Sequence, residues 1–227
     1  MDIIAIIQAR MSSNRFPGKV LHIVNNKYLL QYIIERIKVL NHFKQVIIAT
    51  SNKKSDNPIK EFCDSFGLVC YRGSLCNVVD RFQSLLNEFP CDAFLRINGD
   101  SPLIDHQLIE KGISLFYNGN YDLVTNVLKR TFPKGQSVEI VKTEIFRKLN
   151  QKDLSSDEKE HVTSFFYNNE FLYNICNFSS KRNMSNMQLS VDTIEDMKMI
   201  NKILNNITKQ HFCYSWLELV DIYRSLK

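Results

Sequence analysis

The sequence predicts an α/β protein in which a mainly parallel sheet carries helices on both faces, and three observations support this prediction. The predicted strand 3–8 opens with an unbroken apolar run, residues 3–7, that is rich in β-branched isoleucine, which is typical of a strand buried on both faces. Four such runs alternate with helix-type patterns in the first half of the chain, and successive strand–helix units form parallel sheets with right-handed crossovers. With 227 residues and 44% hydrophobic content, the chain can bury one sizeable core, so we expect one domain over residues 1–227.

The first half of the chain contains the four strand–helix units. The predicted strands are residues 3–8, 46–50, 68–71 and 93–97, and the helices that follow them are residues 29–40, 57–66, 77–86 and a helix from about residue 106. The segment 29–40 repeats apolar side chains at spacings of three and four, as one buried helix face requires. Gly67 is suited to end the second helix, because glycine readily adopts the left-handed conformation of a C-terminal cap.

The second half of the chain changes character. Its predicted strands are residues 121–126, 137–141, 171–178 and 188–192, and its predicted helices are residues 143–150, 157–168, 194–204 and 216–223. Thr193 is a good N-cap for the third of these helices, with acidic residues in the first turn. No internal repeat, low-complexity tract or linker interrupts the chain.

The loop after the first strand, residues 9–19, predicts a phosphate-binding site. It carries Arg10, Arg15 and Lys19, with Pro17-Gly18 directly before the lysine. Arginine guanidinium groups form bidentate hydrogen bonds to phosphate oxygens, lysine adds a point charge, and the N–H groups of a tight loop supply further donors. The loop contains neither GxxxxGK[ST] nor GxGxxG, so a Walker-type nucleotide site and a dinucleotide site are both disfavoured.

Two aspartates end apolar strands and suggest a metal site. Asp100 follows residues 93–97, and Asp192 follows residues 189–191. Magnesium in proteins is typically held by one or two carboxylates together with substrate phosphates. Either aspartate alone is explained by a turn or a helix cap. Their joint position at strand ends, together with the cationic loop, predicts a Mg²⁺ site.

Composition excludes several classes of partner. The net charge of +5 comes without a long Lys/Arg run, so we expect no nucleic-acid partner. No segment has the length of a membrane span, and the acidic Asp2 and short apolar run do not fit a leader peptide. The six cysteines form no CxxC pair, which argues against zinc and for free thiols in the cytoplasm.

The sequence does not assign a role to several further side chains. His161 follows Glu160 on a predicted helix, where a lone histidine is more often a surface residue than a catalyst. Arg130, Arg147 and Arg182 could each meet an acidic substrate, and the sequence does not rank them.

The motifs together resemble one enzyme family. The opening segment 5–21 is similar to that of cytidylyltransferases of the spore-coat polysaccharide (SpsF-like) type, which are relatives of the acylneuraminate and 3-deoxy-manno-octulosonate cytidylyltransferases. The similarity covers nearly the whole chain with its motifs in the same order, and continues through residues 71–74, 79–82, 96–105, 160–163 and 189–196. Gln8 and Gln136 depart from the patterns of related enzymes, so the acceptor is left open.

The resemblance implies a three-layer α/β/α sandwich of the nucleotide-diphospho-sugar transferase (Rossmann-like) fold, with residues 130–180 as a small dimerisation and acceptor lobe. It implies that Arg10 and Lys19 bind the triphosphate with help from Ala9 and Arg15, and that Asp100 and Asp192 bind magnesium. The residues that match the nucleotide-base region are Arg72, Gly73, Ser74, Asp80 and Arg81. Those that we assign to the acceptor side are Gly135, Glu139 and His161.

The function that the resemblance implies is a CTP-dependent cytidylyltransferase, active as a homodimer. An acceptor oxygen of a sugar acid, or of another acidic or phosphorylated molecule, would attack the α-phosphate of CTP and release pyrophosphate, for surface polysaccharide biosynthesis. The alternatives are a nucleotidyltransferase that uses another NTP or a sugar 1-phosphate, and a non-catalytic nucleotide-binding regulator on the same fold. A regulator would keep the cationic loop but would not need both aspartates.

Overall fold

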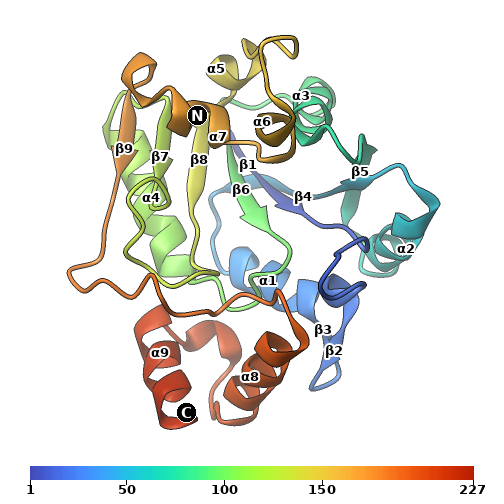
Figure 1. Ribbon diagram of the computed structural model, residues 1–227, viewed down its shortest axis with the longest axis vertical. Helices are drawn as coiled ribbons and strands as arrows, with labels where there is room; N and C mark the ends of the chain where they lie inside the picture. Colours follow the sequence, from blue (N-terminus) through green and yellow to red (C-terminus); the bar gives the residue numbers. More distant parts are fainter.

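The fold is organised around a seven-stranded sheet, seen in a computed structural model that describes residues 1–227 (Figure 1). The strand order is β5-β4-β1-β6-β8-β7-β9. The predicted parallel half is confirmed, because β1 (Ile3–Gln8) pairs in parallel with β4 (Phe43–Ser51) and β6 (Ala93–Asn98), and β4 pairs in parallel with β5 (Val69–Gly73). The carboxyl ends of these four strands therefore meet at one edge of the sheet.

The other half of the sheet mixes directions. β8 (Glu139–Lys142) runs antiparallel to both β6 and β7 (Leu123–Thr125), and β9 (Ile175–Asn177) pairs in parallel with β7 at the edge. Because β8 is antiparallel to β6, its first residue, Glu139, lies beside Arg96 near the carboxyl end of β6. A short antiparallel ribbon, β2 (Ile23–Val24) with β3 (Lys27–Tyr28), forms a separate sheet.

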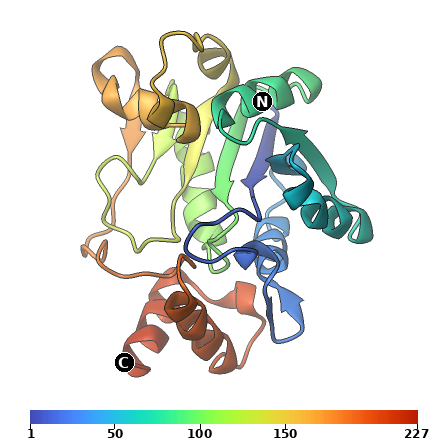
Figure 2. The same ribbon diagram turned by 45° about the vertical axis from the view of Figure 1, so that its right-hand side comes forward.

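Helices cover both faces of the sheet, as the views in Figures 1 and 2 show. One apolar cluster joins one face to α1 (Leu29–Lys38), α2 (Asn57–Ser65) and α4 (His106–Asn118), and it includes α8 (Ile194–Asn205) and α9 (Trp216–Ser225). A second cluster joins the opposite face to α3 (Val78–Glu88), α5 (Thr143–Arg147) and α7 (Ser164–Asn168). In β1, Ile3, Ala5 and Ile7 face the first cluster and Ile4 and Ile6 the second, as the two-residue period of a strand requires.

Three predicted elements differ from the structure. The segment 157–168 is not one helix, because α6 (Ser156–Glu160) and α7 are separated by residues 161–163. The backbone of His161, at the end of α6, is not helical. The segment 188–192 is not a strand, since only Gln188 forms an isolated bridge, with Lys134. The predicted strand 171–178 begins as a 3₁₀ turn, Glu170–Leu172, and only β9 is extended. Short-range patterns did not distinguish these irregular connections from regular elements.

Local capping chemistry agrees with the prediction at other ends. Gly67 adopts φ +61° after α2, and Thr193 caps α8 by accepting from the Asp196 N–H while Asp196 accepts back. No helix is long and apolar enough to cross a bilayer.

Candidate active site

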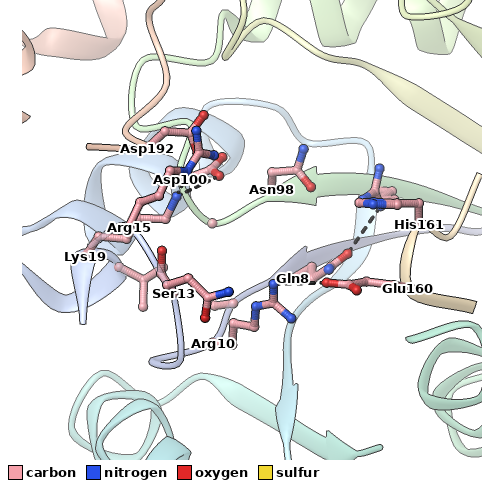
Figure 3. A pocket seen from close by; sticks show the side chains of 15 residues that line it. Gln8, Arg10, Ser13, Arg15, Lys19, Asn98, Asp100, Glu160, His161 and Asp192 are labelled. Atoms are coloured by element: carbon pink, nitrogen blue, oxygen red, sulfur yellow. Dashed lines mark hydrogen bonds and ion pairs between the residues drawn. The ribbon is translucent and has the colours of Figure 1, made fainter. Parts of the chain in front are cut away.

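A polar pocket of about 390 Å³ opens at the carboxyl edge of the sheet (Figure 3). Its walls come from the end of β1 and the loop after it, the end of β6, the C-terminus of α6, and Asp192. In Figure 3, Lys19, Asp100 and Asp192 gather at one end of the pocket, and Glu160 and His161 lie at the other, with Asn98 between them. The pocket therefore has two ends that differ in charge and chemistry.

The loop after β1 is held in a compact shape by its own backbone and by one buried carboxylate. The N–H groups of Ser13 and Gly18 both donate to the Met11 carbonyl, at 2.9 Å each, and Gly18 adopts φ +73°. The Met11 N–H donates to Asp56 at 2.8 Å, and the Ser51 N–H donates to the same fully buried carboxylate. Sequence reasoning missed Asp56, because nothing in the local pattern connects it to a loop 45 positions away.

The three loop cations each contact a carboxylate. Lys19 is almost fully buried, and its Nζ lies 3.2 Å from both Asp100 and Asp192 while it donates to the Val191 carbonyl at 2.5 Å. The more exposed Arg15 binds Asp192 at 3.0 Å, and Arg10 binds Glu160 at 3.1 Å. All three cations also line the pocket, and their binding of phosphate stays a prediction.

Asp192 reaches the site through a crossing segment rather than a strand. The Val191 N–H donates to the Asp100 carbonyl at 2.8 Å, which fixes the two aspartates side by side. Gly135 makes the crossing possible: it adopts φ +92°, and a Cβ there would lie 2.6 Å from the Leu189 carbonyl carbon. Burial alone would raise the pKa of Asp192, but Lys19 and Arg15 lower it below its usual value, so the carboxylate is held ionised.

The aspartate pair fits a divalent cation that is also bound by phosphate. Both carboxylates approach one ammonium nitrogen, which shows that they can share a single cation. No group of three His, Cys, Asp or Glu side chains could hold a metal by itself. Two carboxylates plus substrate oxygens suit Mg²⁺, which usually keeps few protein ligands.

Three polar side chains form the floor of the pocket, on the side of the sheet that α3, α5 and α7 cover. Gln8 and Asn98 are paired in register on β1 and β6, and Arg96 lies two residues before Asn98. Arg96 donates to Gln8 at 3.3 Å and to Glu139 at 2.6 Å. Sequence reasoning missed Arg96 as a site residue, although a charged residue inside an apolar strand was the available signal.

The residues assigned to the nucleotide base lie at the end of β5 and the start of α3, outside the residues that line this pocket. Arg72 donates to the carbonyls of Ser51 and Lys53, and Arg81 is buried and donates to the Ser74 carbonyl. Asp80 is exposed in the first turn of α3.

The space beside Gly73 is already filled. A Cβ there would lie 2.7 Å from Cγ of Arg81, so the absent side chain makes room for this arginine. Gly73→Val would therefore strain the core around Arg81, and it is not a clean probe of base binding.

The three residues assigned to the acceptor side have different surroundings. His161 lines the pocket, with its side chain 58% exposed and 3.5 Å from Asp157. Glu139 is buried, and its carboxylate also accepts from Thr163 at 2.5 Å and from Tyr167 at 2.6 Å. Gly135 packs against the crossing segment. Of the three, only His161 faces the pocket directly.

Comparison with known proteins finds similar sequences and structures among cytidylyltransferases. The family described as Cytidylyltransferase matches residues 4–221. The spore coat polysaccharide biosynthesis protein SpsF of Bacillus subtilis (strain 168) is 30% identical over 209 residues, which are 89% of this chain and 86% of that protein.

Two solved structures share the fold of this chain. A cytidylyltransferase from Leptospira borgpetersenii serovar Hardjo-bovis superposes with a TM-score of 0.93 at 26% identity, over 100% of this chain and 95% of that one. A CMP:2-keto-3-deoxy-manno-octonic acid synthetase complexed with CTP shares the fold, with a TM-score of 0.69 at 16% identity, over 90% of this chain and 99% of the other. These structures confirm the expected nucleotide-diphospho-sugar transferase fold.

Proposed function

This chain belongs to the cytidylyltransferase family and is a nucleotidyltransferase, and we propose that it uses CTP to activate an acidic or phosphorylated acceptor with release of pyrophosphate. The observation that carries the proposal is a pocket in which Lys19 and Arg15 contact the paired Asp100 and Asp192. Arg10 lines the same pocket and pairs with Glu160. Three cations suit a triphosphate, and two carboxylates suit the magnesium that accompanies it. SpsF, named for polysaccharide biosynthesis, supports surface polysaccharide as the destination.

In the proposed reaction, an acceptor oxygen attacks the α-phosphate, and the bond to the pyrophosphate leaving group breaks. Asp100 and Asp192 would hold the magnesium, which neutralises charge on the phosphates when bound. Arg10, Arg15 and Lys19 would bind the leaving phosphates and stabilise the charge that develops on them. The reaction needs no side-chain nucleophile, because positioning and charge neutralisation supply most of the rate.

The proposed base site is the end of β5. It lies three strands away from β6 on the same carboxyl edge of the sheet, with β4, β1 and the cationic loop after β1 between them. Cytosine differs from uracil by an exocyclic amine, which needs an acceptor. The Ser74 carbonyl accepts one hydrogen bond from Arg81, and its second lone pair could accept from that amine.

We expect CTP to be preferred over UTP by at least about tenfold in kcat/KM, because leaving a buried polar group unpaired costs about 1–3 kcal/mol. The measurement is pyrophosphate release from each NTP with a panel of sugar acids, phosphorylated polyols and sugar 1-phosphates. Preference for another NTP would overturn the cytosine assignment, and activity with sugar 1-phosphates alone would overturn the acidic-acceptor assignment. No pyrophosphate from any pair would overturn the proposed reaction.

We also propose that the enzyme is a homodimer that associates through the 130–180 lobe. Phe171 and Leu172, in the turn before the edge strand β9, are 80% and 62% exposed. Adjacent exposed apolar side chains beside an unpaired strand edge are typical of a contact with another chain.

The double variant Phe171→Ser/Leu172→Ser is expected to sediment as a monomer under conditions where the wild type sediments as a dimer. Leu217→Ser, at an exposed apolar position on α9 outside the lobe, serves as the matched control and is expected to remain dimeric. A monomeric wild-type protein at micromolar concentration would contradict the proposal.

A further inference from the structure

We propose that Arg96, Gln8 and Asn98 form a subsite that binds an anionic group on the acceptor, and that Glu139 is the positioning residue that holds Arg96 there. The inference rests on the proposed transfer reaction and assigns the acceptor end of the same pocket. It replaces direct acceptor contact by Glu139, whose carboxylate is buried and fully occupied by protein donors.

The first step is the alternation of side chains along β1 and β6. Toward the amino ends of these strands, the face covered by α3, α5 and α7 carries Ile4, Ile6 and Phe94. Further along the same face, Gln8 follows Ile6 on β1, and Arg96 and then Asn98 follow Phe94 on β6, because successive residues on one face of a strand are two apart. The apolar core therefore gives way to a polar floor at the point where the pocket begins.

The second step is that this floor offers hydrogen-bond donors without partners in the protein. Arg96 uses Nε for Gln8 and Nη1 for Glu139, and its Nη2 has no partner. The side-chain amides of Gln8 and Asn98 donate to no protein atom, although both residues line the pocket. The Arg96 side chain is only 10% exposed, so little water surrounds the guanidinium beyond what enters through the pocket. Donors held in this way favour a ligand that only accepts.

The third step is the charge balance behind the floor. Burial alone would raise the pKa of Glu139, but Arg96, Thr163 and Tyr167 lower it, so the carboxylate stays ionised. Arg130 lies close enough to interact with Glu139, donates to Ser137 at 3.0 Å, and has a buried Nη1 without a partner. Of the two guanidinium groups, only Arg96 forms an ion pair with Glu139, so the nearby Arg130 adds a positive charge that an anion could balance.

The fourth step is that the polar floor and the proposed base site lie on opposite sides of the cationic loop. Strand order places β6 and β8 on one side of β1 and places β4 and β5 on the other. If the base lies toward β5 and the triphosphate lies along the loop at the end of β1, the space over β6 is left for the acceptor. Thr163 binds Glu139 and directly follows the Glu160–Val162 turn, so the network also fixes the pocket wall that carries Glu160 and His161.

The ligand chemistry is a carboxylate or a phosphate, because both accept from a guanidinium and two amides. The test uses the enzyme with saturating CTP and magnesium, so that the nucleotide occupies the cationic loop. Pyruvate, inorganic phosphate and neutral glycerol are titrated separately and followed by calorimetry. The pyruvate and phosphate titrations distinguish the two sources of the anion.

We expect one of the two anions to bind saturably to the wild type, and glycerol not to compete with it. Arg96→Gln is expected to weaken that binding at least about tenfold and to change the affinity for CTP less than about twofold. Because Arg96→Gln leaves the Glu139 carboxylate buried without its cation, it is also expected to lower the melting temperature. The double variant Arg96→Gln/Glu139→Gln removes both charges, and we expect it to recover stability without recovering anion binding.

The subsite would be overturned if neither anion binds the CTP-loaded wild type, or if the anion binds Arg96→Gln as tightly as it binds the wild type. It would also be overturned if Arg96→Gln weakens the binding of CTP as much as it weakens the binding of the anion. Anion binding restored in the stable double variant would show a structural role alone and would also overturn it. Failure of the proposed function has a different signature, because CTP would then fail to bind the wild type. Pyruvate titration of the enzyme without nucleotide would still report on Arg96 in that case.

Discussion

Asp100→Asn and Asp192→Asn are each expected to lower kcat for pyrophosphate release by at least about a hundredfold. Each substitution keeps the shape of the side chain but removes one charged ligand from the proposed magnesium site, and a metal contributes several kcal/mol of transition-state stabilisation. A hundredfold corresponds to about 2.7 kcal/mol, within that range. The two aspartates come from different segments and meet only at this site, so we expect similar losses from either variant.

The measurement is the initial rate of pyrophosphate release over a magnesium titration, with unfolding followed in parallel to show that the fold is intact. Asp221→Asn is the matched control: Asp221 is exposed on α9 and does not line the pocket. Surface substitutions of this kind change stability little, so this control should retain both the stability and the turnover of the wild type. Full activity of Asp100→Asn or Asp192→Asn at limiting magnesium would contradict the metal assignment. So would wild-type activity that resists EDTA.

Lys19→Met is expected to reduce kcat/KM for CTP by about ten- to a hundredfold, because a charge-assisted contact to phosphate is worth about 1.5–3 kcal/mol. The structure adds a second expected effect. The buried Lys19 ammonium separates Asp100 from Asp192, and without it two partly buried carboxylates face each other. The variant should therefore unfold at a lower temperature than the wild type, and magnesium should raise its melting temperature more than it raises that of the wild type.

Arg15→Met is the comparison for this stability effect. Arg15 also binds Asp192, but its side chain is 66% exposed, and exposed ion pairs contribute little to stability. We expect its melting temperature to stay close to that of the wild type. A Lys19→Met protein with wild-type KM for CTP and wild-type stability would place the lysine outside the site and outside the proposed triphosphate contact.

The parallel half of the fold could be predicted because each of its elements has a local signature. Residues 3–7 are an unbroken apolar run, residues 93–97 are apolar except for Arg96, and residues 29–40 repeat with the period of a helix. The cationic loop could be located for the same reason, since a strand that runs directly into it fixes the loop at the sheet edge. The irregular segments 157–168 and 188–192 were predicted wrongly, because packing against other segments overrides local preference there.

By itself the sequence determined the order of strands and helices in the parallel half, and the residue types that the site contains: a loop with three cations, and Asp100 and Asp192 beside it. Only the tertiary structure decided which of these groups meet. Lys19 and Asp192 are 173 positions apart, and they meet because Gly135 lets the 189–191 segment cross closely enough for Val191 to bond the Asp100 carbonyl. Arg96 lies at the pocket, and not in the core, because it falls near the carboxyl end of β6, beyond the core residue Phe94 on the same face, and because Glu139 of an antiparallel strand binds it there. Contacts between distant segments depend on the packing of the whole sheet, and no local pattern of residues encodes them.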